Sequence, residues 1–442
     1  SEMCIRDRIK ESIEADFMRN ETAAKLYGFT AGDSFAAFFG KLSVESVLFY
    51  LFAVAAWTLE NIFEAFRSEV NASIDKMKPH RPKWYRDMVL AYMKDRTLIP
   101  DTDEYDTADM TDEEKVGQLF FARCPAAGQA EKIEAYHLGG YLLFGRDFKD
   151  AAGDWLTEKQ FTETLRSYQA ASAIPLLIGV DEEGGAVARA SRNPNLFEAK
   201  CKSPQALFAQ GGMEAIEADA LSKNTRLLEL GVNVNLAPVA DVSTDPGDFI
   251  YDRAFGRDAK ATAEYVRAVV ENMDAAGVGS VLKHFPGYGN NADTHTGAAL
   301  DERPWEQFIT EDFLPFQAGI DAGAGAVLVS HNVASCMDAA LPASLSPEVH
   351  RVLRQDLDFE GVILTDDLAM DAVDAYARDG SAAVLAVLAG NDMILTTDFE
   401  TQIPQVLAAL EDGTIPRELL DQAVSRVLAW KYDLGLLEEN HD

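Results

Sequence analysis

The sequence of 442 residues is poor in basic side chains and has no long apolar run. Asp and Glu number 73 against 39 Lys and Arg, so the formal net charge is −34. Such a surface repels polyanions, which argues against nucleic acid and acidic lipids as partners. The longest apolar run, 47–57, covers 11 residues, whereas roughly 20 are needed to span a bilayer. We therefore expect no nucleic-acid partner and no membrane partner.

Cysteine is also scarce. The four cysteines, Cys4, Cys124, Cys201 and Cys336, are far apart and form no CxxC pair. This spacing argues against the disulfide framework of small secreted domains and favours reduced thiols. The opening stretch SEMCIRDRIKESIEADF alternates in charge and has no apolar core, unlike a signal peptide. The predicted location is therefore the cytoplasm.

Composition changes near residue 107, which predicts two unlike pieces. Residues 1–107 carry helical patterns, clearest at 43–70, where apolar residues recur at helical spacing. Nothing in this mostly helical piece offers an active site. Residues 108–442 instead alternate short apolar runs with helical segments, and they form the second predicted domain.

Eight short apolar runs, each bounded by Gly, Pro, Asn or Asp, are candidate strands. They lie at 117–123, 139–145, 175–181, 232–241, 278–285, 325–331, 361–367 and 392–397. Continuous Val, Ile and Leu runs are typical of parallel strands buried on both faces. Eight strand–helix units predict an α/β fold, the (β/α)8 TIM barrel. A doubly wound open sheet is the alternative.

Polar residues gather where these strands end, and active sites of such barrels lie at the carboxyl ends of the strands. Asp181 follows the third strand, Lys283 and His284 close the fifth, and Asp366 and Asp367 close the seventh. A carboxylate placed there suits nucleophilic attack or general-base work. We expect one of the two aspartates to do this and the other to cap the following helix.

The stretch KHFPGYGNNADTHTG adds proton chemistry. Asp293 and His295 form an Asp-x-His unit, in which the carboxylate can accept a hydrogen bond from one ring nitrogen while the other exchanges a proton with substrate. The flanking glycines suit a segment that moves when substrate binds.

Two arginines complete a polar pocket lining. Arg189 and Arg253 each lie just past a strand-end segment, and a fixed guanidinium there can contact substrate oxygens in pairs. A hydroxyl-rich ligand such as a sugar fits this lining better than an apolar one.

Metal catalysis is a weaker alternative. His284, His295, Asp293 and Asp366 could converge, but no HExxH or HxH spacing occurs, and Lys283 would repel a cation. The segment GYGNN could bind phosphate, although no GxxxxGKS-type sequence supports a nucleotide. We expect neither a metal nor another cofactor.

Residues 108–440 resemble glycoside hydrolase family 3, in its β-N-acetylglucosaminidase branch. The resemblance rests on ordered motifs: MTDEEKVGQLFF, GGYLLFGRDF, GVDEEGGAVAR, NLAPVADV, DRAFGRD, KHFPGYG, DTHTG, LPASLSP and TDDLAM. It implies an exo-acting enzyme that removes terminal N-acetylhexosamine from carbohydrate substrates such as cell-wall muropeptides. A β-glucosidase or β-xylosidase of the same family is the alternative.

The resemblance also implies roles for individual residues. Asp366 falls on the nucleophile of a retaining mechanism, and His295 on an unusual acid/base oriented by Asp293. The sugar contacts of the family fall on five further positions: Asp181, Arg189, Arg253, Lys283 and His284. Two positions depart from the family pattern, because Tyr288 replaces a common histidine and Ala186 a common arginine.

Residues 1–107 lie outside this resemblance. They faintly resemble phage structural proteins, and SEMCIRDR looks like a translated sequencing adaptor. We hypothesise that the chain joins two unrelated pieces, as in an assembly chimera. A phage structural protein is the non-enzyme alternative, but the predicted barrel makes up most of the chain.

Overall fold

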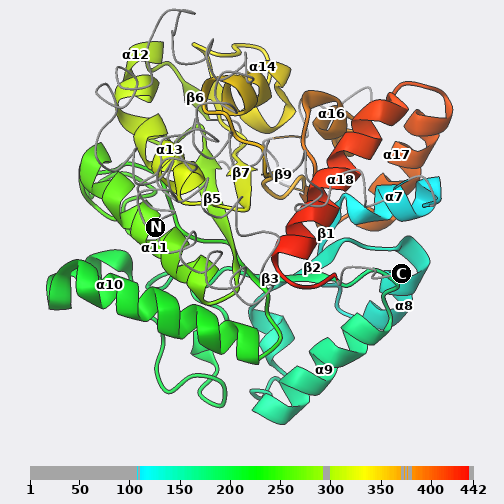
Figure 1. Cartoon of the computed structure of the whole chain (residues 1–442), viewed down its shortest axis with the longest axis horizontal. Helices are drawn as coiled ribbons and strands as arrows, with labels where there is room; N and C mark the ends of the chain where they lie inside the picture. Colours follow the sequence, from blue (N-terminus) through cyan, green and yellow to red (C-terminus); the bar gives the residue numbers. More distant parts are fainter. Residues whose placement is uncertain are drawn as a thin grey trace, which may run out of the picture. The chain divides into compact units, whose positions relative to one another are not determined.

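The computed structural model describes residue 107 and the ranges 110–291, 299–369 and 381–437, together with residues 373 and 376 (Figure 1). The predicted helical piece, except for residue 107, lies outside the described residues. So do Asp293 and His295, and their roles stay predictions. The boundary near residue 107 also stays a prediction.

Eight parallel strands form the centre of the described region (Figure 1). They are β1 (Phe120–Arg123), β2 (Gly140–Leu143), β3 (Leu177–Val180), β4 (Val234–Asn235), β5 (Gly279–Phe285), β7 (Ala326–Val329), β9 (Val362–Thr365) and β10 (Ile394–Thr396). Their order in the sheet is β10-β1-β2-β3-β4-β5-β7-β9.

A parallel bridge joins the two ends of this sheet. It pairs Leu364 of β9 with Met393, the residue before β10, and the Thr365 amide donates to the Met393 carbonyl at 3.2 Å. The sheet therefore closes on itself, which confirms the predicted (β/α)8 barrel. The doubly wound open sheet is wrong, because its edge strands would not meet. Each strand lies within one of the eight predicted runs.

Helices follow the strands and surround the barrel (Figure 1). They are α7 (Asp112–Gln118), α8 (Gln129–Tyr136), α9 (Glu158–Ala170), α10 (Pro204–Glu229), α11 (Ala259–Ala275), α12 (Trp305–Gln307), α13 (Phe313–Asp321), α14 (Pro347–Arg351), α16 (Ala382–Ala389), α17 (Phe399–Glu411) and α18 (Arg417–Asp433). Side-chain caps start several of them. Thr157, for example, forms a reciprocal capping box with Gln160 at the start of α9.

Alternate residues of every strand fill the barrel interior. One buried cluster takes an apolar side chain from each strand: Phe121, Leu142, Leu177, Val234, Val281, Leu328, Leu364 and Leu395. Two further clusters lie between strands and helices. Because side chains alternate between the faces of a strand, this interior set determines which residues beyond it face the barrel axis.

Helix α18 covers the amino-terminal end of the barrel. Its Trp430 belongs to the interior cluster and contacts Gly325, where a Cβ atom would lie 2.1 Å from the indole Nε1. A side chain at position 325 would therefore displace Trp430. No helix among the described residues is long and apolar enough to cross a membrane.

Lys431, next to Trp430, is fully buried. Its Nζ donates to Gln118 Oε1 at 2.7 Å, and no ion pair to it is found among the described residues. Burial lowers the pKa of Lys431 to about 7, whereas an exposed lysine titrates at about 10.4. Between these values the unfolded chain binds more protons, so the free energy of unfolding rises with pH. Below pH 7 the cost of burying the charge applies in full.

Lys431→Met should therefore stabilise the protein. We expect the free energy of unfolding to rise by about 1–3 kcal/mol at pH 6.5. The gain should shrink towards pH 9.5, because the wild-type lysine is then already neutral. Urea unfolding of both proteins, followed by circular dichroism at the two pH values, measures this. A variant less stable than wild type at pH 6.5 would contradict the assignment.

Candidate active site

Asp181, Lys283 and Asp366, three of the predicted site residues, lie just beyond the apolar interior cluster, towards the carboxyl ends of their strands. Leu177 faces the interior, and so Asp181, four residues on, has the same parity. The same reasoning applies to Lys283 after Val281, and to Asp366 after Leu364. The alternation of the strands thus directs these side chains towards one end of the barrel axis.

Lys283 is the centre of a buried charge network. Its Nζ lies 2.7 Å from Asp181 Oδ1 and 2.6 Å from Glu183 Oε1. The residue is 2% exposed. Burial alone would lower the pKa of Lys283, but the carboxylates of Asp181 and Glu183 outweigh it and raise the pKa. Lys283 is therefore a cation whose side chain is held in one orientation by two carboxylates.

Glu183 joins Lys283 to Arg253. Arg253 donates from Nε to Glu183 Oε2 at 3.0 Å and from Nη2 to Oε1 at 2.8 Å. Burial would raise the pKa of the Glu183 carboxyl, but the charges of Arg253 and Lys283 prevail and lower it. The doubly bonded guanidinium is held in one plane, which is the geometry that favours Arg over Lys.

His284 extends the network and has a defined tautomer. Arg253 Nη2 lies 3.0 Å from His284 Nε2, and a guanidinium can only donate. Nε2 therefore accepts, and the proton resides on Nδ1, which donates to Asp241 Oδ2 at 2.8 Å. The imidazole thus accepts from Arg253 and donates to Asp241, with no proton on Nε2 to give to a substrate.

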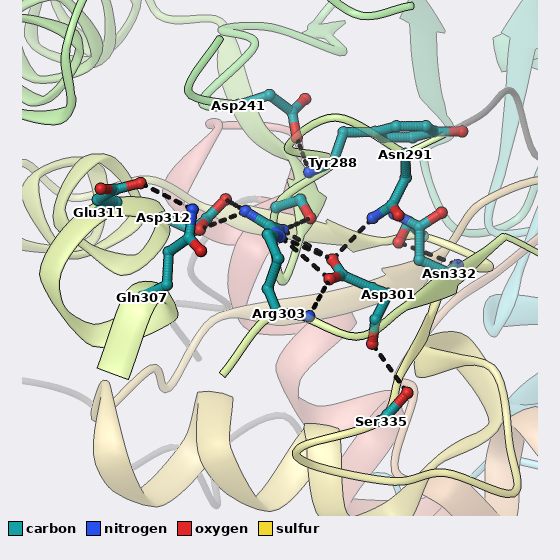
Figure 2. Close-up of polar contacts among 12 residues, drawn as sticks. Asp241, Tyr288, Asn291, Asp301, Arg303, Gln307, Glu311, Asp312, Asn332 and Ser335 are labelled. Carbon is teal, nitrogen blue, oxygen red and sulfur yellow. Dashed lines mark hydrogen bonds and ion pairs between the residues drawn. The ribbon is translucent and has the colours of Figure 1, made fainter. Parts of the chain in front are cut away.

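Asp241 also fixes the turn that follows β5. Its carboxylate accepts the backbone amides of His284 at 3.1 Å and of Tyr288 at 2.7 Å (Figure 2). Tyr288, the departure from the family pattern, is 2% exposed. Its ring packs edge-on against His284, with 5.5 Å between the centroids. Tyr288 thus supports the position of His284.

Arg303 supports the same turn from the other side (Figure 2). It donates to the Gly287 carbonyl at 3.0 Å, to Asp301 Oδ2 at 2.7 Å and to Asp312 Oδ2 at 2.8 Å. Burial raises the pKa of Asp312 to about 7, against the opposing effect of Arg303. Asn291 Nδ2 donates to Asp301 at 2.7 Å, so this cluster also holds the last described residue of the turn.

Asp366 and Asp367 have different surroundings. The Asp366 amide donates to the Val329 carbonyl at 2.9 Å, which ties the end of β9 to β7. Asp367 accepts from the Ala369 amide at 3.0 Å and from Thr397 Oγ1 at 3.1 Å. Asp367 therefore closes the turn after β9, while Asp366 has the parity of the barrel interior.

Arg189 lies outside the Lys283 network. Its backbone amide donates to Glu182 Oε2 at 2.8 Å, and its guanidinium lies 5.8 Å from the Phe144 ring. Glu182 is buried and also accepts the amides of Ala190 and Ser191, at 2.7 and 3.2 Å. The structure thus joins Asp181 and Lys283 to Arg253 and His284 through Glu183, and it holds Arg189 in a separate turn.

Comparison with known proteins identifies the family. Residues 111–430 match the N-terminal domain of glycosyl hydrolase family 3. The chain belongs to this family. A β-hexosaminidase of Xanthomonas campestris pv. campestris (strain B100) is 35% identical over 321 residues, which are 71% of this chain and 92% of the relative. The chain is accordingly a glycoside hydrolase.

Solved family 3 structures agree with the fold. A β-N-acetylglucosaminidase from Paenibacillus sp. str. FPU-7 is 32% identical, with a TM-score of 0.67 over 75% of this chain and 65% of that chain. A β-N-acetylhexosaminidase from Beutenbergia cavernae DSM 12333 is 31% identical, with a TM-score of 0.65 over 74% of this chain and 99% of that chain.

Sequence reasoning missed several groups of this family 3 site. Glu183 and Asp241 also lie at strand ends, but nothing in the sequence indicates that they bond to Arg253 and His284. Arg303 lies two residues from its partner Asp301, but its bond to the Gly287 carbonyl, 16 positions away, forms only on folding. In the described part of the chain, no group of three or more His, Cys, Asp or Glu residues could hold a metal ion.

Proposed function

We propose that this family 3 hydrolase is a retaining exo-β-N-acetylglucosaminidase that acts on cell-wall muropeptides. The main observation is the continuous network from Asp181 through Lys283, Glu183 and Arg253 to His284, at the same barrel end as Asp366. The names of the Xanthomonas, Paenibacillus and Beutenbergia relatives support the sugar assignment.

In this proposal the network binds the terminal sugar. Lys283 Nζ and the Arg253 guanidinium donate to hydroxyl oxygens, while Asp181 accepts from hydroxyl protons. His284 Nε2 already accepts from Arg253, so His284 holds the Arg253 guanidinium in place beside the sugar. Arg189 also contacts the terminal sugar, as the family resemblance implies. The four residues of the network are already fixed by their neighbours, so binding to them costs little side-chain entropy.

Asp366 is the proposed nucleophile. Its carboxylate oxygen attacks the anomeric carbon as the bond to the leaving oxygen breaks, giving a covalent glycosyl-enzyme. Water then attacks the same carbon, the bond to Asp366 breaks, and the sugar leaves with its original anomeric configuration. The turn that Asp367 closes keeps Asp366 at the strand end, where its direction is set by β9.

His295 is the proposed acid and base, oriented by Asp293. It gives a proton to the leaving oxygen in the first step and takes one from water in the second. Retaining enzymes more often use a second carboxylate here. A histidine that is neutral after the first step does not repel an anionic leaving group or acceptor.

A panel of 4-nitrophenyl β-glycosides tests the substrate. We expect kcat/KM for the N-acetylglucosaminide to exceed that for the glucoside and the xyloside by at least about 100-fold, since the site must distinguish an acetamido group from a hydroxyl. Faster cleavage of the glucoside or xyloside would make the chain a β-glucosidase or β-xylosidase.

A second panel of chitobiose and a GlcNAc-containing muropeptide tests the natural substrate. Preference for chitobiose would contradict the muropeptide assignment.

A further inference from the structure

Arg303 is the centre of a buried polar cluster beside the turn that follows β5 (Figure 2). Its side chain is 13% exposed, and those of Asp301 and Asp312 are 2% and 1% exposed. The guanidinium donates to Asp301 Oδ2 at 2.7 Å and to Asp312 Oδ2 at 2.8 Å. Its carbon lies 4.5 Å from the centre of the Phe308 ring. Two ion pairs and an aromatic ring therefore hold Arg303 in one orientation.

Gly287 and Gly289 pack directly against this cluster. A Cβ atom at Gly287 would lie 2.3 Å from Asp312 Oδ1, and one at Gly289 would lie 2.4 Å from the Arg303 guanidinium carbon. Both glycines also have a positive φ, 123° and 53°, which a side chain rarely allows. The two glycines thus let the turn lie in close contact with Arg303 and Asp312.

The cluster joins two stretches of chain that residues 292–298 separate in the sequence. Asn291, the last described residue before this segment, donates from Nδ2 to Asp301 Oδ2 at 2.7 Å. Arg303 donates to the Gly287 carbonyl at 3.0 Å. Asp301 and Arg303 themselves belong to the next described stretch, which begins at residue 299. Side-chain contacts thus hold the end of one stretch to the start of the other.

The second stretch is also anchored to the barrel. Strand β6 (Leu300–Asp301) pairs in parallel with β8 (Val333–Ala334), which follows the barrel strand β7. The Val333 amide donates to the Ala299 carbonyl at 2.8 Å. The positions of Asn291 and Ala299, on either side of residues 292–298, are therefore both set by contacts at the carboxyl end of the barrel.

Residues 292–298 include Asp293 and His295, the proposed proton-transfer pair, which lie outside the described residues. We propose that Asp301 and Arg303 are positioning residues for this proton transfer, because they hold the two ends of the segment together. Chain ends that are already held together reduce the entropy lost when the residues between them are ordered against a substrate. This inference rests on the proposed function and adds Asp301, Arg303 and Asn291 to the residues on which it depends.

Two aryl glycosides test the positioning role in the full chain. They are phenyl and 2,4-dinitrophenyl N-acetyl-β-glucosaminide, of which the first needs a proton on its leaving oxygen and the second does not. The readout is the ratio of kcat/KM for the phenyl substrate to that for the dinitrophenyl substrate. We expect Asn291→Ala and Arg303→Lys to lower this ratio about 10-fold, since general acid catalysis contributes about 100- to 10,000-fold when it is intact. His295→Ala should lower it further.

Arg354→Lys is the matched control. Arg354 also pairs with a buried aspartate, Asp392, and donates to the carbonyls of Phe359 and Gly361 at 2.8 and 2.6 Å. These partners precede β9, at the opposite end of the barrel from the site. The substitution should lower the thermal unfolding midpoint, as in Arg303→Lys, but it should leave the ratio unchanged.

The outcomes separate the two proposals. If the wild type hydrolyses neither substrate, or if His295→Ala leaves the ratio unchanged, the proposed function fails. If the ratio falls in His295→Ala but in neither Asn291→Ala nor Arg303→Lys, the positioning role is wrong and the proposed function stands. An equal loss on both substrates would show a purely structural role and would also overturn the inference.

A fall of the ratio in either variant, with hydrolysis of the dinitrophenyl substrate retained, supports the inference. Asn291→Ala removes one half-buried side chain and leaves the ion pairs of Arg303 in place. It therefore decides the test if Arg303→Lys does not fold.

Discussion

Asp366→Ala is expected to lower kcat on 4-nitrophenyl N-acetyl-β-glucosaminide by about 10,000-fold or more, because no other group takes the place of a lost nucleophile. Stopped assays at high enzyme concentration would measure the residual rate. Sodium azide should restore turnover, since a small anion can enter the space left by the carboxylate. The product should then be the α-glycosyl azide, formed by a single inversion.

Asp367→Asn is the matched control for this variant. Asp367 lies one residue away and holds the turn through Ala369 and Thr397, but it takes no part in the proposed chemistry. We expect its kcat to stay within about fivefold of wild type, because the amide oxygen can still accept from the Ala369 amide while the amide nitrogen donates to the Thr397 hydroxyl. The assignment of Asp366 would fail if the effects of the two substitutions were reversed.

Glu183→Gln should have the second largest effect. Among the described residues, Glu183 is the one carboxylate that contacts both Lys283 and Arg253. An amide would leave two buried cations with a weaker partner and would point donors at donors. We expect kcat/KM to fall by at least about 100-fold, since breaking a buried ion pair costs about 3–5 kcal/mol. Steady-state kinetics together with thermal unfolding would show both the loss of activity and the loss of stability.

The acid sensitivity of the protein should change in the same variant. The folded-state pKa of Glu183 is lowered, so its contribution to stability is present above the unfolded value of about 4.3 and is lost as the pH falls below it. The difference in stability between wild type and Glu183→Gln should therefore narrow from pH 6 towards pH 3. A difference in stability that stays constant over this range would show that Arg253 and Lys283 do not lower the pKa of Glu183.

The barrel was predictable because its signal is local. Each strand is a short continuous apolar run, and the recurrence of eight such runs with helices between them leaves few other folds. The grouping of Asp181, Lys283 and Asp366 followed for the same reason, since parallel strands end at one edge. The small strand pair β6 (Leu300–Asp301) and β8 (Val333–Ala334) was not predicted. Two residues are too few to show alternation.

The partners within the site were not predictable in the same way. Glu183 lies 70 positions from Arg253 in the sequence, and Asp241 lies 43 positions from His284. Nothing near either carboxylate indicates which cation it will contact. Arg303 is a further example, because its bond to the Gly287 carbonyl joins residues that lie 16 positions apart in the sequence. Sequence spacing identifies individual residues at a strand end, whereas the partners in an ion-pair network are known only from the three-dimensional structure.

Trapping of the covalent intermediate tests the central claim most directly. The enzyme would be incubated with the 5-fluoro derivative of N-acetylglucosaminyl fluoride, digested with pepsin and analysed by mass spectrometry. We predict one glycosylated peptide, with the sugar on Asp366, and no label on Asp366→Ala. A label on another residue, or hydrolysis of this compound without any detectable intermediate, would contradict the account.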